Sequence, residues 1–115
     1  MDGKTIDSAK VEWLPHPNPK HVGVFMQTLV DPQTNPLATV HRVRIAPGGE
    51  IIPHIHDKSA ETFLINSGRA LCTMGDSTTE FCAGNLGYAP AGIRHGLKNL
   101  GAEDVYLTTV FTPPL

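Results

Sequence analysis

The chain has 115 residues, with 9 lysines and arginines against 11 aspartates and glutamates, and a formal net charge of -2 at pH 7. This length fits one domain with a single core and argues against a multi-domain protein. No clustered basic face offers itself to nucleic acid, and no stretch approaches the ~20 apolar residues of a membrane-spanning helix. Because the first residues also lack an apolar signal segment, we expect a cytoplasmic protein with no nucleic-acid or membrane partner.

Residues 1–20 are expected to form an N-terminal strap. Three prolines in it cannot donate to a strand ladder and favour an extended chain, namely Pro15, Pro17 and Pro19. The nearby His16 and His21 are interpreted as solvated polar residues. Trp13, the only tryptophan, is predicted to anchor the strap, either on the body of the domain or on a second subunit.

From residue 21 onward, short runs rich in Val, Ile, Thr, Phe and Tyr alternate with turn residues such as Pro47-Gly48-Gly49. None of these runs shows the 3.6-residue apolar period of a helix over three turns. The pattern predicts strands at Val22–Val30, Leu37–Ile45, Glu61–Ile65, Ala70–Met74, Thr78–Cys82, Leu86–Ala89, His95–Leu97 and Val105–Phe111. So many short strands in one small chain indicate an all-β antiparallel sandwich or barrel.

The two cysteines, Cys72 and Cys82, have a spacing that fits no CxxC zinc or redox motif. If the chain reverses through a three-residue loop at 76–78, they lie across a hairpin, close enough to touch. In the other interpretation both are small, buried, apolar residues in the reduced form. Both interpretations stay open at this point.

Candidate metal ligands are clustered near the middle of the chain. His54 and His56 are two residues apart, which on a strand places both side chains on one face, about 6.5 to 7 Å apart and within reach of one ion. Glu61 begins the next apolar run after a turn-like stretch, so its carboxylate can join them. His95 is a further candidate on a later strand. A His-x-His pair alone is weak evidence, because two solvated histidines on an exposed strand give the same pattern.

Glycines and prolines around these residues extend them into two longer patterns, Gly48-x5-His54-x-His56-x4-Glu61-x6-Gly68 and Gly84-x5-Pro90-x-Gly92-x2-His95-x3-Asn99. The patterns match the two motifs of the cupin superfamily at all ten positions. The chain therefore resembles a small single-domain cupin over residues 1–115, with its barrel core over residues 37–112. This resemblance implies a double-stranded β-helix, or jelly-roll, barrel, in agreement with the predicted strands. It also implies the metal ligands, which are His54, His56, Glu61 and His95.

Three imidazoles and one carboxylate suit one divalent transition metal per chain, whether Fe, Mn, Ni, Zn, Co or Cu. Four protein ligands leave two positions of an octahedral ion open for water or a small-molecule substrate. Such an ion could activate dioxygen or act as a Lewis acid on a carbonyl or hydroxyl oxygen. Some members of the cupin family also use the glutamate as a base, so Glu61 is a candidate catalytic residue as well as a ligand.

Strand alternation predicts the wall of a pocket beside the metal. Residues two apart on a strand share a face, so if Glu61 and His95 point inward, Phe63, Ile65 and Leu97 point inward as well. His41 alternates with Val43 and Ile45, and either contacts substrate or supports the site, or is a hydrogen-bonded part of the barrel wall. The predicted pocket residues are therefore His41, Phe63, Ile65 and Leu97.

The last predicted strand places Thr109 and Phe111 on one face and Thr108 and Val110 on the other, and the pattern does not decide which face looks inward. An apolar pocket with few charged groups favours a small neutral, aromatic or weakly polar ligand over a phosphorylated sugar, which would need convergent Arg or Lys.

We expect a metal-dependent small-molecule enzyme, with oxygenase-type chemistry favoured over a Lewis-acid isomerase or lyase that acts on a small sugar or carbonyl compound. The alternative from another class is a cupin that binds a metabolite or a metal without catalysis, and a third is a metal-free barrel. Cupins of this size commonly pair through sheet edges, and the apolar strap leaves such an edge to cover, so we also expect a homodimer.

Overall fold

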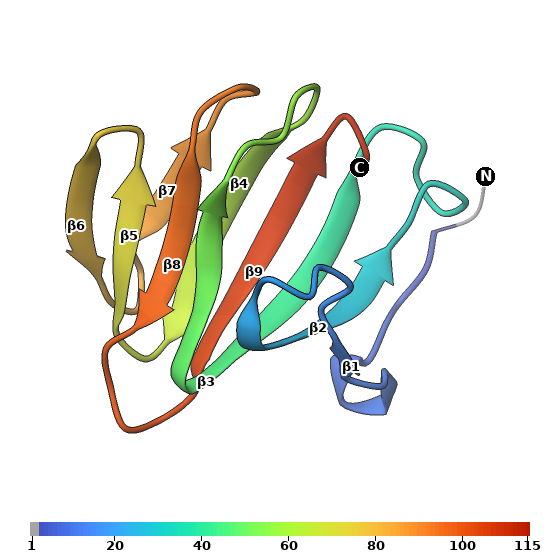
Figure 1. Ribbon diagram of the computed structural model, residues 1–115. Coiled ribbons are helices and arrows are strands. Elements are labelled where there is room, and N and C mark those ends of the chain that lie inside the picture. Colours follow the sequence, from blue (N-terminus) through green and yellow to red (C-terminus); the bar gives the residue numbers. More distant parts are fainter. Residues whose placement is uncertain (1–2) are drawn as a thin grey trace.

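The structure is a computed structural model that describes residues 3–115 (Figure 1). Its strands alternate buried and exposed side chains and are separated by the turn residues noted above. The elements in chain order are η1 (Ser8–Lys10), β1 (Leu14–Pro15), β2 (Val22–Val30), β3 (Thr39–His54), β4 (Ala60–Ser67), β5 (Ala70–Met74), β6 (Ser77–Phe81), β7 (Leu86–Ala89), β8 (His95–Asn99) and β9 (Val105–Thr112). Every pairing between these strands is antiparallel, which confirms the predicted all-β architecture.

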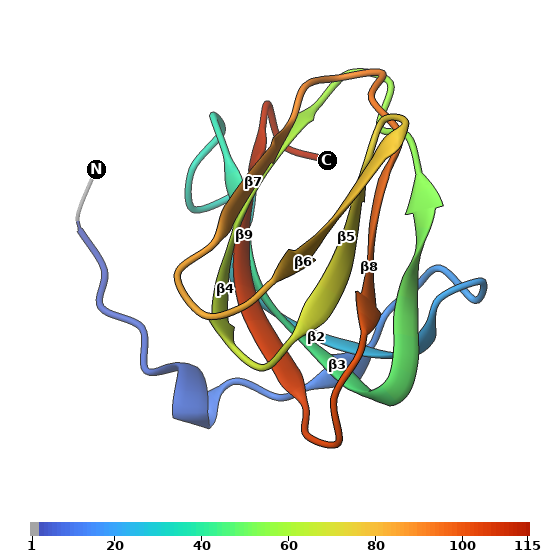
Figure 2. The same cartoon turned by 90° about the vertical axis from the view of Figure 1, so that its left-hand side faces the viewer.

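Strand β3 joins the two halves of a curled sheet. Its residues 39–45 pair with β9, while its residues 50–54 pair with β8. The sheet runs in the order β6-β5-β8-β3-β9-β4-β7, with β2 paired to β3 and β1 paired to β2. Figure 2 shows the sheet rolled around an interior, with β4, β7 and β9 on one side and β5 and β8 on the other. The result is a half-barrel of jelly-roll type.

The turn predicted at Pro47-Gly48-Gly49 is wrong, because β3 continues through it. Gly48 has a φ of +78°, a conformation that favours glycine, and the strand bends there. A Cβ on Gly49 would lie 2.7 Å from the main-chain oxygen of Val22, so the two strands approach each other closely at this point. The bend allows one continuous strand to serve both halves of the sheet.

The N-terminal strap is anchored on the outer face of the sheet. The ring of Trp13 meets that of Tyr106 edge-on at a centroid distance of 6.0 Å, and the guanidinium of Arg42 lies 5.6 Å from each ring centroid. Part of the strap, Leu14–Pro15, also pairs with β2, which corrects the prediction of an unpaired strap. A proline is tolerated there because the strand lies at an edge of the sheet.

The cysteines are not paired. The chain reverses through Gly75 and Asp76, so that Cys72 lies opposite Thr79 and not opposite Cys82. Both cysteines are free, Cys72 buried and Cys82 exposed. The predicted juxtaposition is wrong because the turn is shorter and comes earlier than the predicted loop, and the interpretation as a buried apolar residue holds for Cys72 alone.

The hydrophobic core fills one part of the barrel interior. Its side chains come from strands in both halves of the curled sheet, namely Val24, Val43, Ile45, Phe63, Ile65, Ala70, Cys72, Leu97, Val105 and Leu107. On β9, Thr109 and Phe111 are buried with these residues, which decides the inward face that the sequence left open. Among residues 3–115, no helix has the length and apolar character needed to cross a membrane.

Candidate metal centre

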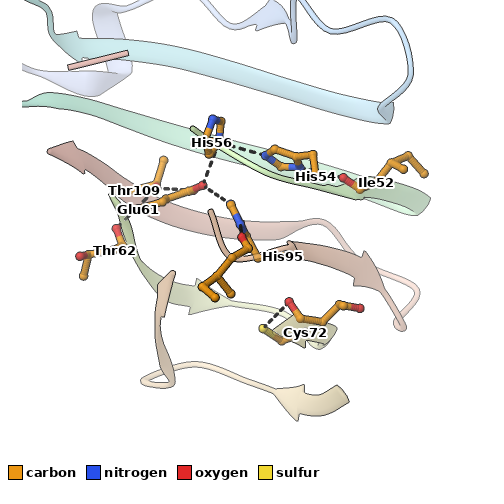
Figure 3. A network of polar contacts seen from close by, with 10 residues as sticks. Ile52, His54, His56, Glu61, Thr62, Cys72, His95 and Thr109 are labelled. Carbon is orange, nitrogen blue, oxygen red and sulfur yellow. Dashed lines mark hydrogen bonds and ion pairs between the residues drawn. The ribbon is translucent and has the colours of Figure 1, made fainter. Parts of the chain in front are cut away.

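The four expected metal ligands lie together in the barrel interior (Figure 3). His54 is the last residue of β3 and His56 follows two residues later, while Glu61 lies in β4 and His95 begins β8. One ligand atom from each of the four lies within 4.8 Å of the ligand atoms of the other three. Residues from three separate strands thus meet at a point that can hold one metal ion.

Two of the imidazoles are oriented by main-chain carbonyls. Nδ1 of His54 donates to the oxygen of Ile52 at 2.8 Å, and Nδ1 of His95 donates to the oxygen of Ile93 at 2.8 Å. Because a carbonyl only accepts, the proton of each neutral ring lies on Nδ1 and leaves a lone pair on Nε2. Both Nε2 atoms point toward the centre of the cluster (Figure 3).

The two carboxylate oxygens of Glu61 have different partners, one in the barrel wall and the other in the cluster. The hydroxyl of Thr109 donates to Oε2 at 2.6 Å. The other oxygen, Oε1, lies 2.9 Å from Nε2 of His95 and 3.6 Å from Nε2 of His56. Lone pairs of the carboxylate and of the neutral imidazoles therefore converge, and such a group of acceptors is favourable only with a cation or a shared proton between them. The donor set and its orientation fit a divalent metal.

Burial and hydrogen bonding shift the pKa of Glu61 in opposite directions. Burial raises the pKa of its carboxyl group, but the imidazoles of His56 and His95 and the hydroxyl of Thr109 outweigh burial and hold this pKa at about 2. Burial lowers the pKa of His95, yet its contacts with Glu61 and with Ile93 raise it on balance above the usual value. A carboxylate held so firmly as an anion is suited to bind a cation and is a weak proton acceptor.

A cavity of about 460 Å³ opens beside the cluster. Its wall is mostly apolar, and none of the described residues that line it is a lysine or an arginine. The lining residues are His16, Pro17, Asn18, His21, Met26, His41, Val43, Ile51, His54, His56, Glu61, Thr109, Phe111 and Leu115. The cavity has room for a small organic molecule next to the four clustered residues.

Of the predicted pocket residues, only His41 lines this cavity. It is buried, its Nδ1 lies 3.2 Å from the hydroxyl of Thr28, and burial lowers its pKa. Phe63, Ile65 and Leu97 do face inward, but the structure places them in the hydrophobic core, away from the cavity. Alternation along a strand predicts which face of the sheet a side chain lies on, but it does not predict how far along the barrel that side chain lies.

Two histidines interpreted as solvated, His16 and His21, are half-buried in the structure and line the cavity. Their loop folds back over the open part of the barrel, which a local pattern in the sequence does not reveal. The signal available in the sequence was the histidine count. All six histidines of the chain line the cavity or belong to the metal cluster beside it.

Comparison with known proteins agrees with the fold and the site. Residues 41–111 match the family described as Cupin domain, so this chain belongs to the cupin family. It is also 39% identical over 62 residues to an uncharacterised protein of Streptomyces coelicolor, a match that spans 54% of this chain and 55% of that protein. The aligned part is thus about half the length of that relative.

Solved structures show the same architecture over nearly the whole chain. A predicted oxalate decarboxylase from Thermotoga maritima superposes with a TM-score of 0.88 and 20% identity, covering 96% of this chain and 99% of that one. The polyketide cyclase RemF from Streptomyces resistomycificus superposes with a TM-score of 0.87 and 18% identity, covering 96% and 80%. At these identities the likeness establishes the cupin jelly-roll fold, and confirms the resemblance inferred from the two motifs.

We predict that Thr109→Val lowers the affinity for Zn²⁺ about tenfold, because a residue that orients a metal ligand typically contributes this much or more. The variant keeps the shape of the side chain and removes only the hydroxyl that donates to Glu61. Competition with a chelator measures the affinity. Thr108→Val is the matched control, since Thr108 is next in the chain and donates to Asn66 at an exposed position. Equal affinities of the two variants would contradict the role given to Thr109.

Glu61 is also expected to make the metal-free protein sensitive to acid. Its folded pKa of about 2 lies below the ordinary value of 4.5, so its stabilising contribution is present above pH 4.5 and is lost as the pH falls toward 2. The difference in unfolding free energy between wild type and Glu61→Gln should therefore shrink over this range. Chemical denaturation in the presence of a chelator measures it, with Glu103→Gln at an exposed position as control. A difference independent of pH would contradict the prediction.

Proposed function

We propose that this protein is a metal-dependent enzyme that acts on a small, largely apolar organic molecule by oxygenase-type chemistry. The observation that carries the proposal is the cluster of His54, His56, Glu61 and His95 beside an apolar cavity of about 460 Å³. A divalent first-row metal bound there would supply open positions for a substrate oxygen and for dioxygen.

The chain's own residues have separable tasks in this proposal. Main-chain carbonyls orient two ligand imidazoles, and Thr109 holds one carboxylate oxygen of Glu61 so that the other faces the cluster. Apolar side chains such as Met26, Val43 and Ile51 line the cavity, where they exclude water and bind the carbon frame of a substrate. Because the described lining has no lysine or arginine, it favours a neutral or weakly acidic molecule over a phosphorylated one.

Oxygenase-type chemistry is preferred because it makes few demands on acid and base groups. When both atoms of dioxygen enter an electron-rich substrate such as a phenol or a diketone, no further reductant and no strong base are needed. The resemblance to cupins made Glu61 a candidate catalytic base, but a carboxylate with a pKa of about 2 is a weak proton acceptor.

A Lewis-acid isomerase or lyase is the second candidate, and His41 is the observation that favours it. This imidazole lines the cavity, and burial lowers its pKa, so that it is neutral near pH 7 and able to accept a proton from a substrate. Decarboxylase and cyclase are names given to proteins of the same fold, and neither reaction is an oxygenation. These names support the second candidate.

The test is a turnover assay of protein loaded separately with Fe, Mn, Ni, Zn, Co or Cu, against a panel of small phenols, diketones and sugars. We expect substrate-dependent uptake of dioxygen at an oxygen electrode, products visible by NMR, and loss of both in His54→Ala. Product formed without dioxygen would favour the isomerase or lyase. Binding of a compound without turnover by any metal form would contradict an enzyme and favour a metabolite-binding cupin.

We also propose that the protein forms a homodimer through the edge of the sheet at β1 and β2. Leu14 in β1 and Val22 at the start of β2 are 53% and 55% exposed, so this edge is apolar and uncovered in the single chain. Sedimentation equilibrium at micromolar concentration should give a dimer, which Leu14→Glu shifts toward monomer. Leu37→Glu, at a position 75% exposed between β2 and β3, is the control. A wild-type monomer would refute the proposal.

A further inference from the structure

Two histidines outside the metal cluster face the cavity from the loop 16–21, which connects β1 to β2. One hydrogen bond lies within the loop, since the amide of His21 donates to the oxygen of Asn18 at 3.2 Å. A second ties the loop to β2, since the amide of His16 donates to the oxygen of Val24 at 2.9 Å. The rings of His16 and His21 meet edge-on with their centroids 4.6 Å apart. The loop thus presents a fixed pair of imidazoles to the cavity.

Main-chain amides determine which nitrogen of each ring carries the proton. The amide of Asn18 donates to Nδ1 of His16 at 3.0 Å, and the amide of Ile52 donates to Nδ1 of His21 at 3.0 Å. An amide N–H can only donate, so each Nδ1 must be an unprotonated acceptor. In a neutral imidazole the proton then lies on Nε2. Both rings therefore carry an Nε2–H group.

These two N–H groups are available to a ligand. Within residues 3–115, neither Nε2 has a hydrogen-bond acceptor, and both rings line the cavity. Because each Nδ1 accepts a main-chain hydrogen bond, each ring is a neutral imidazole that donates from Nε2. A polar donor at an otherwise apolar wall orients a ligand by the oxygen that it binds.

The donor pair stands at a fixed position relative to the metal centre. The main chain of Ile52 connects them, since its amide donates to His21 and its carbonyl accepts from Nδ1 of His54. The ring centroids of His21 and His54 are 5.2 Å apart. A small molecule can therefore reach the donor pair and the metal cluster at the same time.

We infer that His16 and His21 bind one oxygen of the substrate through their Nε2–H groups, while a second oxygen of the same molecule is directed to the metal cluster. The substrate class is accordingly a small molecule with two oxygen functions, at least one of them a hydrogen-bond acceptor away from the metal. This inference rests on the proposed binding of a small molecule in the cavity.

The first experiment compares two ketones of equal size on the Zn²⁺-loaded protein. 4-Hydroxybutan-2-one has two oxygen functions, whereas pentan-2-one has a methyl group in place of the hydroxyl. NMR titration should show that the hydroxyketone binds about fivefold more tightly, the effect of roughly one net hydrogen bond. Long-range ¹H–¹⁵N spectra should show the Nε2–H tautomer at His16 and His21, with signals that shift when the hydroxyketone is added.

Two variants separate substrate binding from a structural role of His21. In His21→Asn the amide oxygen replaces Nδ1 as acceptor for Ile52, but the side chain does not reach the position of Nε2. In His21→Gln the longer side chain places an N–H donor there instead. We expect His21→Asn to lose the fivefold preference while keeping its zinc, and His21→Gln to retain the preference. His16→Asn and His16→Gln repeat the comparison at a ring that has no hydrogen bond with Ile52.

Several outcomes would overturn the inference. These are equal binding of the two ketones by wild type, no binding of either, an Nδ1–H tautomer at either ring, or a preference that persists in both asparagine variants. A purely structural role of His21 would give the opposite pattern, with zinc affinity lowered in His21→Gln and unchanged in His21→Asn. Binding to the zinc form is measured without turnover, so these results are independent of the oxygenase proposal.

Discussion

Lone pairs that converge on one point organise this domain. The ligand atoms of His54, His95 and Glu61 lie within 4.8 Å of one another, and the carbonyls of Ile52 and Ile93 accept hydrogen bonds from Nδ1 of the two rings. Such a grouping of acceptors is favourable only with a cation or a shared proton between them. It persists because the strands that carry these groups are held by the sheet on both sides, and because Thr109 restrains the carboxylate from β9.

The strands were largely predictable because their signals are local. Apolar–polar alternation and clusters of turn residues mark each run, and every predicted strand occurs in the structure. Their ends shift by at most two residues, except that the strand predicted at Leu37–Ile45 continues to His54. The failures lie at turns. Pro47-Gly48-Gly49 bends a strand where the same residues elsewhere end one, and the position of the turn before Ser77 decides the partner of Cys72. Whether such residues bend a strand or end it, and where a hairpin turns, depends on pairing with the neighbouring strands, which the local sequence does not reveal.

Within the site, the residues of the two cupin motifs were predicted and the cavity histidines of the loop 16–21 were not. The resemblance to those motifs implied all four residues of the metal cluster, which lie on β3, β4, β8 and the segment between β3 and β4. Alternation alone placed Phe63 and Leu97 on the correct face but at the wrong level of the barrel. The loop 16–21 has no periodicity, so only its tertiary contacts reveal that it closes the side of the cavity.

The histidines of the metal cluster lie inside the segment that matches the cupin family, whereas His16 and His21 lie outside it. The metal cluster lies within residues 41–111, the segment shared with other cupins, whereas the loop 16–21 precedes it. The strand pairings that bring the four ligands together, β3 with β8 and β9 and β4 with β9, do not include that loop. On our proposals, substrate recognition can therefore vary in the loop while the cupin motifs keep the cluster, and relatives with the same ligands need not share a substrate.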